Sequence, residues 1–254
     1  MQARVDDAVQ AVVDVVKQWD PVDTIAKVES GEDIYDPYFF VSLDVYYEGE
    51  LPELAERKRQ FATAFAFESL EPSRKDRFLL DEIPFRLEYK QKSRFDEILE
   101  TADGTDGVLR DSGTYVFYRM KEAEVVYAKS DWLERARQRL EDLPDAFWTH
   151  LRNTVQARME HYLSDLSAAV MRSDQLFYLV SSAGFARSLC GVLFAINQEF
   201  EPSGRLMAER VRSLPVLPDS FHGRFESFLR HEADLRPDRK REIAELLAKS
   251  VIAL

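Results

Sequence analysis

Apolar and polar residues alternate in two short stretches of the N-terminal half, a pattern typical of strands with one buried face. In the first stretch, one face carries Val41, Leu43, Val45 and Tyr47, and the other carries Phe40, Ser42, Asp44 and Tyr46. In the second, Phe85, Leu87 and Tyr89 alternate with Arg86, Glu88 and Lys90. The pattern predicts two strands that each present one carboxylate on the face opposite the apolar one.

Spacings of three and four residues between apolar positions predict helices in most of the remaining chain. In the N-terminal half we expect helices at 5–19, 52–63, 93–99 and 132–143, and strands at 24–28, 64–70 and 125–127. The run 114–119 fits a strand and a helix equally well. After Pro144 the helical pattern dominates, at 145–171, 174–199, 219–233 and 238–252, with one shorter helix between the second and third of these.

The predicted class is therefore α+β. A mixed sheet with flanking helices is expected at residues 1–143, and an all-α helical bundle at residues 144–254. A cleft between two such domains is the default place for a ligand site.

Charge and composition limit the classes of partner that we expect the protein to bind. The chain has 34 Lys and Arg against 46 Asp and Glu, a formal net charge of −12. Such a surface repels a nucleic acid backbone, so we expect no duplex nucleic acid partner. We expect no membrane partner, because the longest apolar stretches are far shorter than the roughly 20 residues that span a bilayer. We also expect a cytoplasmic location, because the N-terminus lacks a signal-peptide pattern and the one cysteine, Cys190, allows no disulfide framework.

The two strand carboxylates are the candidate chemistry. If the two strands are neighbours, Asp44 and Glu88 share a face with Ser42 and Arg86. Two such carboxylates can bind Mg²⁺ (or Mn²⁺), with nucleotide phosphates supplying further oxygen ligands. The alternative is that they pair with Arg86, Lys90 or solvent. No serine-hydrolase elbow, zinc-ligand spacing or phosphate-cradling glycine loop is found in the sequence.

The order of these residues carries a family resemblance. A Ser30-Gly31 turn precedes the Ser42-Leu43-Asp44-Val45 strand, Glu88 follows on a later strand, and a helical segment at 193–205 lies downstream. This resembles the polymerase-β-type nucleotidyltransferase superfamily, and in particular small bacterial nucleotidyltransferase-like proteins with a C-terminal helical domain. The family motif is a Gly-Ser turn, an Asp-x-Asp strand and a third acidic residue. Here the motif is degenerate, with the turn inverted.

Within that resemblance, Asp44 corresponds to the second acid, Glu88 to the third, and Ser42 stands at the position of the first. The resemblance implies that the protein binds a nucleoside triphosphate with Mg²⁺ in the interdomain cleft and transfers a nucleoside monophosphate to an unknown small-molecule or protein acceptor. Asp44 and Glu88 would be the catalytic and metal-binding residues. The implied nucleotide contacts are Ser30, Gly31, Ser42, Arg86, Asn197 and Arg205.

Two other functions stay open on the sequence. Ser42 in place of an acid favours a catalytically impaired nucleotide-binding or regulatory module of the same fold. An interaction protein that forms a homodimer without ligand chemistry is the third alternative.

Overall fold

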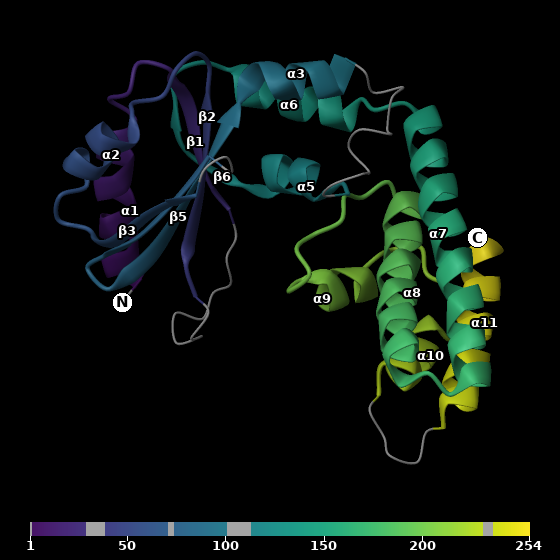
Figure 1. Cartoon of the computed structure of the whole chain (residues 1–254). Coiled ribbons are helices and arrows are strands. Elements are labelled where there is room, and N and C mark those ends of the chain that lie inside the picture. The colour runs from purple at the N-terminus through teal and green to yellow at the C-terminus, as the bar shows by residue number, and fades with distance from the viewer. Residues whose placement is uncertain (1, 29–38, 71–73, 101–112, 231–235) are drawn as a thin grey trace. The chain divides into compact units, whose positions relative to one another are not determined.

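The computed structural model describes residues 2–28, 39–70, 74–100, 113–230 and 236–254. These residues form two compact units (Figure 1). The sheet unit comprises Met1–Ala102 and Arg119–Asp142, and the helical unit comprises Asp103–Tyr118 and Leu143–Leu254. The α+β class expected from the sequence is confirmed.

The helical unit takes in more than the C-terminal bundle expected at 144–254. Thr114 and Phe117 belong to it because the Thr114 hydroxyl accepts a hydrogen bond from the Glu201 backbone N–H, at 2.8 Å, and Phe117 packs on Phe200. The division between the units therefore falls inside one helix, α5.

The sheet unit is built on six strands in the order β3-β4-β5-β2-β1-β6. In chain order its elements are α1 (Gln2–Val16), β1 (Val22–Val28), β2 (Val41–Tyr47), α2 (Leu54–Gln60), β3 (Phe65–Leu70), β4 (Lys75–Leu80), β5 (Ile83–Gln91), α3 (Lys92–Glu100), the end of α5 (Tyr115–Glu122), β6 (Glu124–Ala128) and α6 (Trp132–Glu141). Strands β2 and β5 run parallel, and every other neighbouring pair is antiparallel. The sheet is therefore mixed, as expected.

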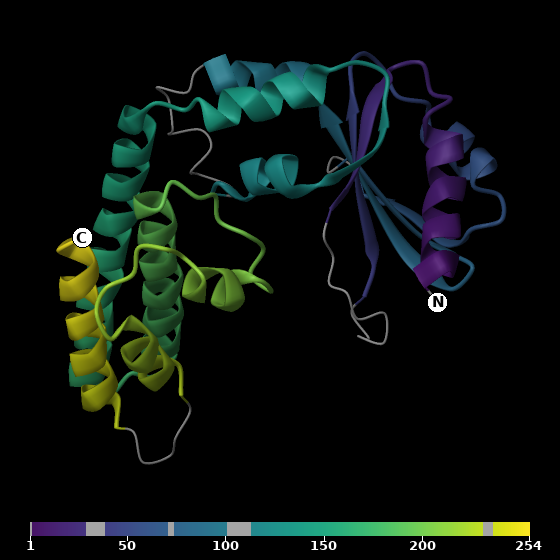
Figure 2. The same cartoon turned by 180° about the vertical axis from the view of Figure 1, so that it is seen from behind.

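One face of the sheet forms the main hydrophobic core beneath α1, which lies along that face in Figure 2. Val12 of α1, Leu43 of β2 and Leu87 of β5 are fully buried. Complete burial of side chains of this size contributes about 1.5–3 kcal/mol each. The predicted alternation is confirmed, because the apolar members of both strands belong to this core.

Helices α3 and α6 cover part of the other face. Tyr46 of β2 packs its ring against Phe95 of α3 and Trp132 of α6, with ring centroids 5.8 and 5.3 Å away. The same face carries Ser42 and Asp44, which are also buried. The polar residues of β2 thus lie inside the unit and need partners there.

Strand β4 is not among the strands expected from the sequence pattern. Its charged start includes Asp76, which is fully buried. Arg57 of α2 donates to Asp76 at 2.9 Å, and the Tyr89 hydroxyl donates to the same carboxylate at 2.6 Å. This buried ion pair joins α2 to β4 and lets a charged segment lie within the sheet.

The helical unit contains α7 (Asp145–Arg172), α8 (Gln175–Ile196), α9 (Met207–Arg212), α10 (Phe221–Leu229) and α11 (Pro237–Ile252). Helices α7 and α8 run side by side in Figures 1 and 2. They approach closely at Gly184, where an added Cβ would lie about 2.4 Å from the Tyr162 ring. By length and apolarity α8 passes for a membrane-spanning helix, but Phe185, Leu189 and Leu193 are fully buried, which is typical of a core helix.

The contribution of the Arg57–Asp76 pair to stability can be tested with a variant and a control on the same helix, α2. We expect Arg57→Met to lower the free energy of unfolding by about 3–5 kcal/mol, because it leaves the buried Asp76 carboxylate without its cation. Arg59→Met removes an arginine two residues away whose side chain is 77% exposed. That control is expected to change stability by less than about 0.5 kcal/mol. Urea unfolding of both variants measures the difference, and equal losses would contradict the assignment.

Candidate functional site

Asp44 and Glu88 lie directly opposite each other in the parallel β2–β5 pair. In the same register, Ser42 lies opposite Arg86 and Tyr46 opposite Lys90. The expectation that the two strands are neighbours and share their polar face is therefore correct. The two carboxylates predicted from the alternation are brought together in the centre of the sheet.

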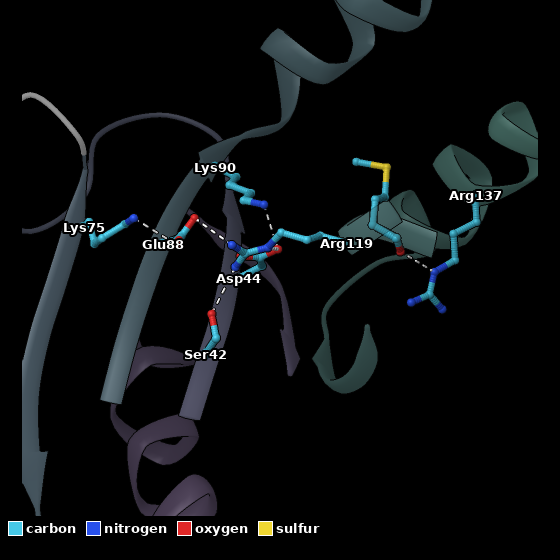
Figure 3. A network of polar contacts seen from close by, with 8 residues as sticks. Ser42, Asp44, Lys75, Glu88, Lys90, Arg119 and Arg137 are labelled. Atoms are coloured by element: carbon cyan, nitrogen blue, oxygen red, sulfur yellow. Dashed lines mark hydrogen bonds and ion pairs between the residues drawn. The ribbon is translucent and has the colours of Figure 1, made fainter. Parts of the chain in front are cut away.

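Arg119 of α5 binds both carboxylates (Figure 3). Its Nε donates to Asp44 Oδ2 at 3.1 Å, and its Nη2 contacts Asp44 Oδ1. Nη2 also donates to Ser42 Oγ at 3.1 Å, and Nη1 lies 3.1 Å from Glu88 Oε2. One guanidinium thus bridges every acidic and hydroxyl group that the sequence placed in the motif on these two strands. The fork of a guanidinium matches carboxylate geometry, which gives such contacts both strength and direction.

Two lysines complete the cluster. Lys90 Nζ lies 2.7 Å from Asp44 Oδ2, and Lys75 Nζ of β4 lies 3.0 Å from Glu88 Oε1. The alternative reading of the sequence, in which Lys90 pairs with a strand carboxylate, is therefore confirmed. Together the two lysines and Arg119 outnumber the two carboxylates by one positive charge.

The ionisation of Glu88 reflects these partners. Burial alone would raise the pKa of its carboxyl group, but Arg119 and Lys75 outweigh burial and hold the pKa at about 2. Burial lowers the pKa of Lys90, and Asp44 opposes that effect. At neutral pH Glu88 is therefore fully ionised, and it owes this to the neighbouring cations.

The position of Arg119 depends on α6. Arg137 of α6, which is labelled in Figure 3, donates from Nε to the Met120 carbonyl at 2.9 Å. Its Nη2 also donates to the Ala123 carbonyl. These carbonyls lie in the last turn and C-cap region of α5, where helix carbonyls lack partners of their own. Arg137 thereby fixes the end of the helix that carries Arg119.

Besides Lys75, the site residue that the sequence analysis missed is Arg119. The run that contains it was equally compatible with a strand and a helix, and the helix is what forms. A signal was present nonetheless: Arg119 is the one charged residue between the apolar neighbours Tyr118 and Met120, both of which are buried. A cation within such a run indicates a buried acidic partner.

The cluster does not fit a divalent metal as it is arranged. Two carboxylates could ligate Mg²⁺, but each already contacts cations at salt-bridge distance. Among the residues that the structure describes, no group of three or more His, Cys, Asp or Glu side chains is arranged to hold a metal ion. Metal binding by Asp44 and Glu88 stays a prediction, and this donor set favours a guanidinium over Mg²⁺.

Of the other predicted site residues, Arg86 lies opposite Ser42 in the strand pair, whereas Asn197 and Arg205 belong to the helical unit. Arg86 lies over the Phe40 ring, 4.0 Å from its centroid, on the same strand as Glu88. Asn197 caps α8 and clamps residue 216, donating to the Val216 carbonyl at 2.9 Å and accepting from its N–H at 2.8 Å. This gives Asn197 a structural role. Arg205 is exposed in the helical unit, and Ser30 and Gly31 lie outside the described residues.

Fold and site together define the class: the protein has a nucleotidyltransferase-like fold, with the motif carboxylates paired with Arg119, Lys75 and Lys90. A solved structure with the same fold is a nucleotidyltransferase-like protein from Exiguobacterium sibiricum. It is 12% identical to this chain, with a TM-score of 0.50, and the match covers 98% of this chain and 74% of that one. At this identity the likeness establishes the fold alone.

Sequence comparison adds one match. The model of a domain of unknown function, DUF4037, matches residues 114–205. No curated protein matches the chain. The matched segment begins at Thr114 and includes both Arg119 and Glu201, so it contains one of the three cations of the cluster and neither of its carboxylates.

The low pKa of Glu88 predicts a pH dependence of stability. Because the pKa is depressed in the folded protein, the stabilisation is present above the unfolded value of about 4.5 and is lost as the pH falls towards 2. We expect Glu88→Gln to lower the free energy of unfolding by about 3 kcal/mol at neutral pH. The difference from the wild type should narrow between pH 4.5 and 2.

The matched control is Glu68→Gln, on an exposed position of β3 in the same sheet. Urea unfolding between pH 2 and 7 measures all three proteins. A Glu88→Gln difference that is independent of pH would contradict the charge explanation.

Proposed function

We propose that the protein is a nucleotide-binding module with the nucleotidyltransferase-like fold, in which Arg119 takes the place of Mg²⁺ as the counter-charge of Asp44 and Glu88. The observation that carries this proposal is the single guanidinium that contacts both carboxylates and Ser42. A phosphate would then be attracted by the excess cation of the cluster. Under this proposal, no metal ion needs to bridge the carboxylates and the nucleotide phosphates.

The exposure of the two lysines supports this function. The Lys75 and Lys90 side chains are 22% and 12% exposed, whereas Asp44 is fully buried. A polyanion that approaches the cluster therefore meets ammonium groups before it meets the Asp44 carboxylate. Contacts between such cations and phosphate oxygens are stronger than neutral hydrogen bonds.

A second candidate function is the transfer of a nucleoside monophosphate from an NTP, with Mg²⁺, to an unknown acceptor. The direct opposition of Asp44 and Glu88 in the sheet favours it, because the two acids are already side by side. This function requires Arg119 to withdraw from both carboxylates. The two functions therefore predict opposite effects of removing Arg119.

Titration calorimetry separates the two functions. We expect ATP, GTP, CTP or UTP to bind the wild type in EDTA, with little gain on adding Mg²⁺. Arg119→Met should weaken this binding by about tenfold or more, because it removes one positive charge and leaves the carboxylates to repel phosphate. The control is Arg135→Met on α6, whose side chain is 67% exposed and pairs only with the exposed Asp131 among the contacts described.

Other results would contradict the proposal of a nucleotide-binding module. Binding that requires Mg²⁺, becomes tighter in Arg119→Met and is accompanied by transfer of radiolabelled nucleoside monophosphate would establish the enzyme. Failure of all four nucleotides to bind in either condition would overturn both functions and leave the cluster with a structural role.

A further inference from the structure

The helical unit contains a pocket of about 590 Å³ that has no part in the Asp44 cluster. Helices α8, α9 and α10 and the chain between α8 and α9 contribute to its walls. Its apolar lining includes Cys190, Met207, Phe225 and Leu229, and its charged groups are Arg187 and Glu201. The volume lies within the usual range of small-molecule sites, and a mostly apolar wall with few polar groups is typical of them.

Glu201 is built into this pocket. Its Oε1 fills the space beside Gly191 of α8, where an added Cβ would come within 2.8 Å of it. Its backbone N–H is held by the Thr114 hydroxyl at 2.8 Å. A side chain at position 191 would displace the carboxylate, so the absence of one at Gly191 and the bond to Thr114 together keep the carboxylate at the wall.

The charge of Glu201 is poorly compensated there. Burial raises the pKa of its carboxyl group, and the charges of Arg187 and Arg158 offset this only in part. Both arginines are exposed. A desolvated carboxylate of this kind gains most from a ligand cation that comes into direct contact with it.

Arg187 supplies the second charge. It lies three residues before Cys190 on α8, lines the same pocket as Glu201 and keeps an exposed side chain. The pocket thus offers a partly buried anion, a solvated cation and an apolar surface between helices. Complementarity requires a ligand with the reverse arrangement of charges.

We propose that this pocket binds a small zwitterion with an apolar body, of the class of a hydrophobic α-amino acid, with its ammonium group on Glu201 and its carboxylate on Arg187. The apolar side chain then lies against Met207, Phe225 and Leu229. The site belongs to the helical unit and does not depend on the function proposed for the Asp44 cluster.

Three probes that share one apolar body test the proposal: L-phenylalanine, 2-phenylethylamine, which lacks the carboxylate, and 3-phenylpropanoate, which lacks the amine. Each is titrated into the full chain and followed by calorimetry and by NMR. We expect L-phenylalanine to bind about tenfold more tightly than either analogue, since each analogue loses one charged contact.

Two variants test which pocket residue contacts each charged group of the ligand. Glu201→Gln should reduce the affinity for L-phenylalanine to that for 3-phenylpropanoate, and Arg187→Gln should reduce it to that for 2-phenylethylamine. Glu199→Gln and Arg172→Gln are the matched controls, because both residues are exposed, in the same unit and outside the pocket lining. Ala208→Phe, which fills the pocket from α9, should abolish binding of all three probes.

Several results would overturn the proposal. They are the failure of all three probes to bind, equal affinities of the wild type for the three, or binding that persists in Ala208→Phe. Equal weakening of every probe by Glu201→Gln would also overturn it, because that is the result of a purely structural role. If Glu201→Gln does not fold, the comparison of the wild-type affinities for the three probes still tests the proposal.

Discussion

The contact between Arg119 and the buried Asp44 is the interaction on which the sheet unit depends. Asp44 is fully buried in the middle of a six-stranded sheet, where an unpaired carboxylate would be strongly destabilising. The guanidinium can reach it only if α5 is helical, if its end is held by Arg137, and if β2 and β5 keep their register. The position of the Arg119 side chain therefore depends on local structure, on packing and on electrostatics together.

The same contact links the fold to the function that we propose. In a fold of the nucleotidyltransferase-like kind, the strand carboxylates need positive charge from some source, and here the chain supplies it. A metal ion would be exchangeable and would bring coordination sites for phosphate, whereas a guanidinium is permanent and brings only hydrogen bonds. The two proposed functions, nucleotide binding alone and nucleotide transfer, thus differ in which cation faces Asp44 and Glu88.

The sequence was sufficient for features that repeat along one element and insufficient for those set by distant partners. The alternation in β2 and β5 identified the core face, the polar face and the opposing acids. Strand β4 escaped notice because the burial of Asp76 depends on Arg57, on another element. Arg119 escaped for the same reason, since 75 residues separate it from Asp44 and the intrinsic preference of its segment was balanced between strand and helix.

Cys190 has a practical consequence for work in solution. Burial and the nearby Glu201 raise the pKa of its thiol to about 12, so at neutral pH it is almost entirely protonated and a poor nucleophile. It is also the one cysteine in the chain. Surface cysteines introduced singly or in pairs can therefore be labelled with fluorophores or spin labels on the native background, without first replacing a residue of the core.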